Sequence, residues 1–300
     1  MHMLEVTLTD SNFPHQTYLT PFMESKKLRW MRDGKRRNIN FYTDNFIKKE
    51  VIQIPQDGNL NILVMLEPFT NPAWTDIYDY IRTDFEKFDL IITHNLMKLG
   101  DLIVMRPDKF HYSTKCCTTS WLEPDMVGIQ LKSKMISMPF SSKKFSEGHS
   151  LRHEIYNKYK DSGLIDFFGT GIEGYEGEFR DCFKDYKYSV VIENGLQHGF
   201  NSEKLNDAFL TGSIPLYWGS NIWDKNYNQQ SIIHFNPKAD TINWNFEDSL
   251  NNFDILIKEI YDTDPYDKLT SAIESNYNYT LTKLVSEDNI YDILVERGIV

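Results

Sequence analysis

The chain has 300 residues, of which 41% are hydrophobic and 14% aromatic, and its formal net charge is −11. This length is enough for one large domain or two domains of medium size. Because an acidic surface repels phosphate backbones, nucleic acid is excluded as a general partner. The three cysteines (Cys116, Cys117, Cys182) fit neither a disulfide framework nor metal-ligand spacing, and no secretory leader or membrane-length apolar run is visible. We therefore expect a soluble protein of a reducing compartment.

Short apolar runs alternate with helix-like segments in the first half of the chain. Residues 61–66 (NILVML) have the composition of a buried strand. Residues 73–88 carry apolar side chains at helical spacing, and residues 89–93 (DLIIT) are apolar again. A strand, a helix and a strand at this spacing predict a parallel sheet.

An irregular segment at 106–139, with three prolines, separates the two halves. We place the domain boundary there, so that residues 1–128 form one domain and residues 129–300 the other. The second half resumes the alternation more clearly, and its tail from residue 246 is mostly helical in pattern. Its predicted strands and helices cover 134–138, 149–162, 164–168, 178–186, 188–192, 202–210 and 214–218. This order predicts a doubly wound α/β fold.

The richest stretch of polar and glycine residues follows the predicted strand 188–192. That strand ends at Glu193 and Asn194, and two glycines, Gly195 and Gly199, follow in the loop. Glycine permits unusual backbone angles and the close approach of a ligand. Ligands of open α/β sheets bind beyond the carboxyl ends of the strands, so this loop is a candidate binding site.

The next helix begins at Asn201 or Ser202, which are both good N-cap residues. Glu203 in its first turn suits the helix dipole, whereas the cation of Lys204 does not. A bound anion would resolve that conflict, because free N–H groups, the dipole and a lysine together form a phosphate site. The alternative is that Lys204 points to solvent.

The order I-E-N, S-E-K-L and A-F-L-T-G-S-I-P-L-Y-W-G-S in residues 192–220 resembles the donor-site signature of the α-1,3/4-fucosyltransferases, glycosyltransferase family 10. The resemblance extends upstream through MISMPF at 135–140, Arg152 and IDFFG at 165–169. The resemblance covers about residues 134–235, and within this range the sequence is most similar to the bacterial members of the family. Phe200 stands where those members tend to have tyrosine, so it lacks the hydroxyl for one polar contact to the nucleotide.

The resemblance implies a GT-B fold, with two Rossmann-like domains facing across a cleft. The second domain would bind a GDP-sugar and the first the acceptor, with inversion at the anomeric carbon and no bound metal or other cofactor. Arg152 and Lys204 would neutralise the donor diphosphate, and Glu203 would accept hydrogen bonds from donor hydroxyls. Glu193 and Asn194 would contact the donor or hold the loop. Phe200 would pack on the nucleotide or belong to the core.

An inverting transfer needs a base for the acceptor hydroxyl. Glu67, in VMLEPF, follows the predicted strand 61–66 and resembles the glutamate of the family's L-E-S-P element. We predict Glu67 as this base, with Asp76 and Glu123 as weaker candidates. The alternative for Glu67 is a surface carboxylate at a strand end.

Four further patterns carry weaker signals. Residues 169–174 fit G-x-G-x-x-G without a prompt helix, and residues 262–264 fit the D-x-D of metal-dependent transferases but lie in a late acidic loop. His149 and His153 share a helix face without an evident third metal ligand. The basic run 26–37 is most simply a solvated face, and a contact with an anionic acceptor or a membrane surface is its alternative.

The sequence thus predicts a fucosyltransferase that moves L-fucose from GDP-β-L-fucose to a hydroxyl of an oligosaccharide or glycoconjugate. Two alternatives stay open: the same scaffold acting on another nucleotide sugar, and a catalytically silent sugar-nucleotide or glycan-binding protein. The absence of an anchor before the matched region suggests a cytoplasmic bacterial or viral enzyme. Acceptor identity is not readable from these residues.

Overall fold

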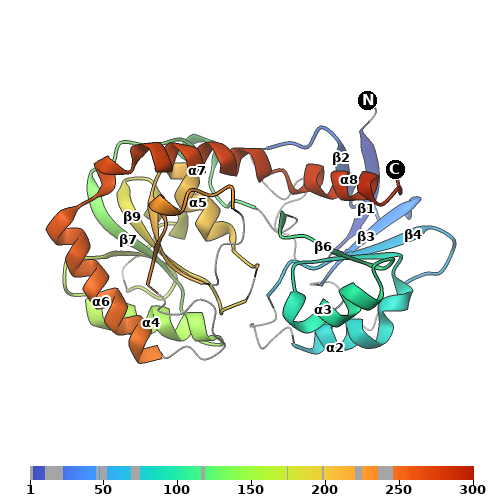
Figure 1. Ribbon diagram of the computed structural model, residues 1–300, viewed down its shortest axis with the longest axis horizontal. Helices are drawn as coiled ribbons and strands as arrows, with labels where there is room; N and C mark the ends of the chain where they lie inside the picture. Colours follow the sequence, from blue (N-terminus) through green and yellow to red (C-terminus); the bar gives the residue numbers. More distant parts are fainter. Residues whose placement is uncertain are drawn as a thin grey trace. The chain divides into compact units, whose positions relative to one another are not determined.

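The chain forms two α/β units, each built on its own sheet (Figure 1). The computed structural model describes residues 3–10, 23–44, 47, 53–68, 75–115, 119–173, 175–197, 199–219, 225–235 and 246–300. The first unit consists of Met1–Thr119, Gln197–Phe200 and Lys283–Val300, and the second of Ser120–Leu196 and Asn201–Thr282. We expected residues 1–128 and 129–300. The main difference is the C-terminal segment, which joins the first unit.

The first unit has a sheet of six parallel strands in the order β2-β1-β3-β4-β5-β6. The strands are β1 (Leu4–Thr9), β2 (Leu28–Met31), β3 (Ile39–Thr43), β4 (Leu60–Val64), β5 (Leu90–Thr93) and β6 (Phe110–Tyr112). The central strands are buried on both faces, which is why they are almost continuously apolar. All six carboxyl ends lie at one edge of the sheet, where ligands of such folds bind.

Helices cover both faces of this first sheet. One core combines Ile77 of α2 (Thr75–Asp84) and Leu99 of α3 (Leu96–Met105) with alternate strand residues. The other core contains Ile290 and Leu294 of α8 (Ser286–Glu296), and Figure 1 shows this helix lying along the strands at the start of the chain. The apolar stripe of α8 therefore closes the first unit, although it comes last in the sequence.

The second unit has five parallel strands in the order β11-β10-β9-β7-β8. They are β7 (Lys134–Phe140), β8 (Asp166–Gly169), β9 (Tyr186–Ile192), β10 (Ile214–Trp218) and β11 (Ile233–His234). The helices are α4 (Glu147–Tyr159), α5 (Glu203–Thr211), α6 (Phe246–Thr263) and α7 (Thr270–Lys283), with a short 3-10 helix at Phe179–Phe183. Leu151 of α4 and Ile257 of α6 share one core with Val190 of β9.

The predicted elements of the second half are confirmed to within a few residues, including the strand at 214–218. In the first half, residues 61–66 and 89–93 correspond to β4 and β5. Strands β1, β2, β3 and β6 were not foreseen. The basic run 26–37, read as a solvated face, in fact contains β2, in which Leu28 and Trp30 are buried. The charged residues of this run made the short edge strand hard to recognise from the sequence pattern.

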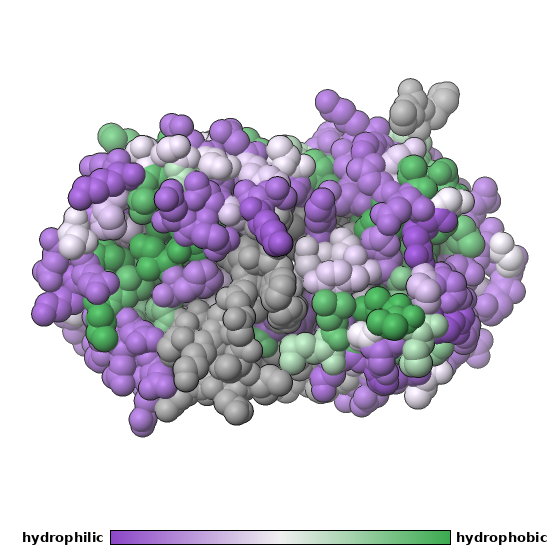
Figure 2. Space-filling model, viewed as in Figure 1, coloured by the Kyte–Doolittle hydropathy of each residue, from purple (hydrophilic) through white to green (hydrophobic). Residues whose placement is uncertain are grey.

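The surface over α3 is apolar in the view of Figure 2. Four large side chains of this helix are exposed there: Leu96, Met97, Val104 and Met105. Three basic residues of the run 26–37 are paired with carboxylates, since Lys27, Arg36 and Arg37 form ion pairs with Asp292, Asp57 and Asp33. Among the described helices, none has the length and apolar character needed to cross a membrane.

Candidate active site

Glu193 directly follows β9 and is almost fully buried. Its Oε1 accepts the backbone N–H of Ser202 at 2.8 Å and the hydroxyl of Tyr217 at 3.3 Å. Burial raises the pKa of this carboxyl, while nearby Lys204 and the Ser202 bond oppose the rise. The structure shows that Glu193 ties the start of α5 to β10, and contact of Glu193 with the donor stays a prediction.

Arg152 lies on α4 with only 4% of its surface exposed. Its Nη2 donates to the carbonyl of Ile192, and to Oδ1 of Asn194 at 3.2 Å. Burial lowers the pKa of the guanidinium to about 10, and the neighbouring carboxylates of Glu193 and Glu203 oppose this shift. The predicted cation and the predicted asparagine thus meet at the carboxyl end of β9, with the side chain of Arg152 held in one orientation.

The predicted pair Glu203 and Lys204 occupies the first turn of α5. The two side chains form an ion pair at 2.5 Å, and each is 20% exposed. Burial favours the neutral form of Glu203, but Lys204, the helix N–H groups and Arg152 outweigh it and lower the pKa of the carboxyl. The alternative in which Lys204 points freely into solvent is therefore wrong, because its ammonium is held beside Glu203.

The start of α5 contains polar atoms that the chain itself does not satisfy. Ser202 is the N-cap, as expected, but its hydroxyl makes no capping bond. The side-chain nitrogen of Asn201 and the hydroxyl of Ser202 are both buried without a hydrogen-bond partner. Unpaired buried polar groups are costly and uncommon in folded proteins. Here they lie beside Lys204, where an anion would complete them.

The start of α4 reaches the same place, which sequence reasoning missed. The backbone N–H of Gly148 donates to the carbonyl of Asn194 at 3.1 Å, and a Cβ at Gly148 would lie 1.7 Å from the carbonyl oxygen of Glu193. Only glycine permits this approach. The available signal was the position of Gly148 one turn before Arg152, on the same helix.

His149 lies near the same cations. Burial, followed by the cations Arg152, Lys143 and Lys204, lowers the pKa of its imidazole to about 3. Its Nδ1 faces the hydroxyl of Ser146, the N-cap of α4. Two helix N-termini and these cations therefore converge near the end of β9, an arrangement suited to a diphosphate. The sequence pattern indicated only a weak zinc site at His149, and the described residues contain no cluster of three metal-ligating side chains.

Phe200 is grouped differently from the other predicted donor residues. Residues Gln197–Phe200 belong to the first unit by their contacts. The ring of Phe200 lies 5.1 Å from that of His94, whose Nδ1 is 2.7 Å from the side-chain nitrogen of Gln197. Gly199 has φ +75°, and a Cβ there would lie 2.5 Å from the hydroxyl of Tyr112. Contact of Phe200 with a nucleotide stays a prediction.

Glu67, the predicted base, lies in the first unit just beyond β4 and is half-buried. Its backbone is held on both sides. The N–H of Glu67 donates to Oδ2 of Asp44 at 2.7 Å, and its carbonyl accepts the hydroxyl of Tyr78 at 3.1 Å. The location at a carboxyl strand end is as expected, while the catalytic role stays a prediction.

The two weaker base candidates have ordinary surroundings. Asp76 is exposed in the first turn of α2. Glu123 is exposed and pairs with Arg180 in the second unit. Neither is held at the end of a buried strand as Glu67 is.

The D-x-D and G-x-G-x-x-G patterns lie in the second unit, at 262–264 and 169–174, and Gly174 is outside the described residues. Asp264 pairs with Lys187 and accepts the hydroxyl of Tyr188 at 3.0 Å, so other side chains of the second unit hold its carboxylate. After Gly169, the next described helix begins only at Phe179, whereas in a dinucleotide-binding site the glycine-rich turn leads directly into a helix. The described residues contain no cluster of three metal-ligating side chains. Metal independence itself stays a prediction.

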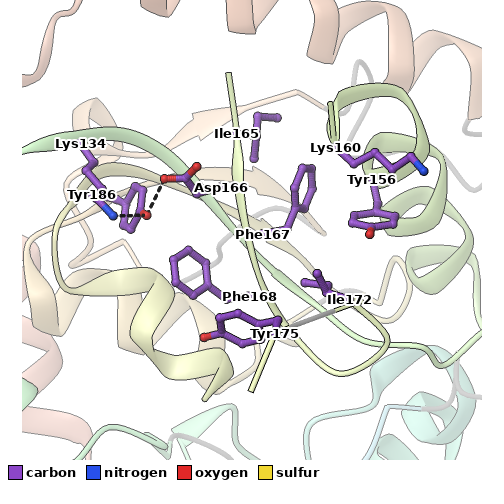
Figure 3. Close-up of a pocket in the computed structure, with 10 residues that line it drawn as sticks. All are labelled: Lys134, Tyr156, Lys160, Ile165, Asp166, Phe167, Phe168, Ile172, Tyr175 and Tyr186. Atoms are coloured by element: carbon purple, nitrogen blue, oxygen red, sulfur yellow. Dashed lines mark hydrogen bonds between the residues drawn. The ribbon is translucent and has the colours of Figure 1, made fainter. Parts of the chain in front are cut away.

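A hollow of about 360 Å³ lies along β8 at the edge of the second sheet (Figure 3). Lys134 and Tyr186 meet on one side of it, with a hydrogen bond from the tyrosine hydroxyl to Asp166 at 2.7 Å. These residues begin β7, β9 and β8. The hollow is therefore separate from the group at the carboxyl end of β9.

Residues 129–242 match the model of the C-terminal part of glycosyltransferase family 10, the fucosyltransferases. Residues 129–242 are therefore a region of the glycosyltransferase family 10 type. The family match contains β9, α5 and the residues that converge on them, from Gly148 to Lys204. The resemblance found from the sequence signature is thereby confirmed.

Two curated proteins that this chain resembles are fucosyltransferases by name. An alpha-(1,3)-fucosyltransferase, FucT of Helicobacter pylori, is 34% identical over 62 residues, which are 20% of this chain and 13% of that protein. A putative fucosyltransferase, R654 of Acanthamoeba polyphaga mimivirus, is 25% identical over 121 residues, or 38% of this chain and 20% of that protein. The chain thus spans a fifth or less of the length of these relatives.

Solved structures support the predicted fold of the chain. A crystal structure of an alpha1,3-fucosyltransferase aligns with a TM-score of 0.52 at 14% identity, covering 90% of this chain and 81% of that one. The pneumococcal O-GlcNAc transferase GtfA, in complex with UDP and GlcNAc, gives a TM-score of 0.52 at 12% identity, covering 86% and 57%. The predicted GT-B type, with two Rossmann-like α/β units, is confirmed.

Proposed function

We propose that this protein is a fucosyltransferase that moves L-fucose from GDP-β-L-fucose to a hydroxyl of an acceptor glycan, with inversion at the anomeric carbon. The observation that carries the proposal is the convergence of Arg152, Lys204 and the unsatisfied start of α5 at the carboxyl end of β9. This group lies within the region that matches family 10. The names of the relatives support fucose as the transferred sugar.

On the donor side, the reaction breaks the bond between the sugar carbon and the diphosphate oxygen. Negative charge grows on the departing GDP, and fixed cations and helix N–H groups lower the barrier when they are aimed at that charge. Arg152 is already locked by Ile192 and Asn194, so little reorganisation is needed. Glu203 holds Lys204 in place and offers an oxygen to a donor hydroxyl.

On the acceptor side, the attacking hydroxyl must lose a proton as its oxygen bonds to the sugar carbon from the face opposite the leaving group. Glu67 is our candidate for the base. Its carboxyl follows a buried central strand, and its backbone is fixed by Asp44 and Tyr78. The acceptor would bind to the first unit, whose sheet presents Glu67 at a carboxyl strand end.

The first test is a calorimetric titration of the full chain with GDP, GDP-fucose, GDP-mannose, UDP-galactose and UDP-N-acetylglucosamine, with EDTA present throughout. Binding of GDP and GDP-fucose in EDTA, with little binding of the uridine nucleotides, supports the donor site and its independence of metal. A preference for a uridine nucleotide overturns the fucosyl proposal and keeps the scaffold. Binding of no nucleotide overturns the donor site.

The second test is transfer to a panel of oligosaccharide acceptors, with GDP release as the readout. The anomeric configuration of the product, read by NMR, decides whether the reaction inverts. GDP-fucose binding without transfer to any acceptor and without slow donor hydrolysis would favour a silent binding protein. We also propose action in the cytoplasm, in keeping with Cys182, which is a buried free thiol.

A further inference from the structure

Asp44 follows β3, the neighbour of β4, and its carboxylate reaches the turn that carries Glu67. Its Oδ2 accepts two successive backbone N–H groups, from Leu66 at 2.9 Å and from Glu67 at 2.7 Å. The register pairs Thr43 with Val64, so Asp44 stands beside the point where β4 ends. The geometry is that of a carboxylate clamping the first peptide groups beyond a strand.

The clamp is buried and therefore strong. Asp44 is 1% exposed, and hydrogen bonds to an ionised acceptor are shorter and stronger than neutral ones. Without the clamp, the N–H groups of Leu66 and Glu67 would need other partners at the end of the sheet. The carbonyl of Glu67 is held separately by Tyr78, so the whole residue is fixed at its backbone.

We propose that Asp44 is a positioning residue that sets the direction in which the Glu67 carboxyl leaves the sheet, and thereby the distance between base and acceptor hydroxyl. This inference rests on the proposed role of Glu67 as the base. A displacement of about 1 Å in a reacting group can cost roughly 100-fold in rate. Asp44 acts on the step at the acceptor and has no part in holding the donor diphosphate.

The experiment compares four variants of the full chain: Asp44→Ala, Asp44→Asn, Glu67→Gln and Asp89→Ala. Asp89 is the matched control, because its Oδ2 accepts the N–H of Asn61 at 2.8 Å near the other end of β4. GDP release from GDP-fucose is measured with the acceptor that the panel selects. The dissociation constant for GDP and the unfolding midpoint are measured for each variant.

We expect Asp44→Ala to lower kcat by roughly 30–100-fold, with the GDP dissociation constant changed less than about twofold, the difference that 0.4 kcal/mol makes. Asn keeps a side-chain oxygen for both N–H groups but loses the charge, so Asp44→Asn should fall between the wild type and the alanine variant. Asp89→Ala should keep the kcat of the wild type even if its unfolding midpoint drops. If Asp44→Ala does not fold, Asp44→Asn decides: a lowered kcat at unchanged GDP affinity supports the inference.

The outcomes separate this inference from the proposed function. If Glu67→Gln is inactive while Asp44→Ala and Asp44→Asn keep wild-type kcat, positioning by Asp44 is wrong and Glu67 remains the base. If Glu67→Gln keeps its kcat, the proposed base is wrong and the inference falls with it. A kcat loss in Asp89→Ala that equals the loss in Asp44→Ala also overturns the inference, since it would show general loosening of β4.

Discussion

Arg152 on α4 donates a hydrogen bond of 3.2 Å to the side-chain oxygen of Asn194, which lies just beyond β9. The contact joins two residues 42 positions apart in the chain. It leaves the guanidinium almost completely buried, yet beside the unsatisfied start of α5. A cation kept dry in this way interacts strongly with an anion that displaces the remaining water.

Replacement of Arg152 by alanine should weaken GDP binding by about 1.5–3 kcal/mol, the range for hydrogen bonds to charged groups. Arg152→Lys keeps the charge but loses the planar fork, so its loss should be smaller. Calorimetry gives both affinities. Lys158→Ala is the control, because Lys158 lies on the same helix, is half exposed and pairs with Asp254. Equal affinity for GDP in wild type and Arg152→Ala would refute the anion site.

Replacement of Glu67 by glutamine should lower kcat by roughly 100- to 10,000-fold, the usual contribution of general base catalysis. The amide cannot take the proton of the acceptor hydroxyl, and the donor group in the second unit is untouched, so GDP affinity should be unchanged. Initial rates and calorimetry on the same preparation test this. Asp76→Asn, at an exposed carboxylate of α2, should keep the wild-type rate. Loss of kcat in Asp76→Asn alone would transfer the role to Asp76.

Gly148→Ala should damage the donor site by steric overlap. The added Cβ would lie 1.7 Å from the carbonyl oxygen of Glu193, so α4 has to shift away from β9. Overpacking of this kind costs about 1–3 kcal/mol of stability. We expect a lower unfolding midpoint together with weaker GDP binding.

Gly100→Ala is the control for that change. Gly100 lies in α3, and nothing comes within 4 Å of a Cβ added there. Alanine in a helix interior is favoured over glycine by roughly 0.5–1 kcal/mol, so Gly100→Ala should be neutral or stabilising. A Gly148→Ala variant that behaves like Gly100→Ala would mean that the close approach of α4 to β9 is wrong.

Asp207 makes stability depend on pH. Burial raises the pKa of this carboxyl to about 8, although the hydroxyl of Ser120 and the N–H of Trp121 donate to it. The folded chain therefore keeps the proton up to about pH 8, while the unfolded chain releases it near pH 4. Since the folded state binds more protons between these values, the stabilising contribution is present at low pH and is lost as pH rises toward 8.

Asp207→Asn removes this titration. The difference in unfolding free energy, variant minus wild type, should increase by at least about 1 kcal/mol between pH 5 and pH 8. This is less than the free energy that corresponds to a pKa shift of one unit. Urea unfolding at the two pH values measures it. Asp161→Asn, at an exposed carboxylate, should show no such change. A pH-independent difference between Asp207→Asn and wild type would contradict the raised pKa.

The sequence was sufficient to predict secondary structure and site residues where an apolar pattern and a short motif occur in the same segment. Strands β7, β9 and β10 are apolar runs bounded by loop residues. Helix α5 begins after its N-cap residue Ser202 and ends at Gly212, which has a left-handed backbone conformation. The signature across 192–220 indicated a resemblance to glycosyltransferase family 10, and residues 129–242 match the model of that family. It also named Arg152, Asn194 and Lys204, whose proximity the structure then established.

The tertiary structure decided what depends on contacts distant in sequence. Nothing local in the amphipathic pattern of α8 says that its apolar stripe buries against β1 and β2, at the opposite end of the chain. The sequence did not show that the carboxylate of Glu193 accepts hydrogen bonds from Ser202 and Tyr217 and so connects α5 with β10. Asp44 could not be connected with Glu67 from the sequence, because only the pairing of β3 with β4 brings the two strand ends together. Burial and long-range hydrogen bonds determine the role of a polar side chain, and both exist only once the chain has folded.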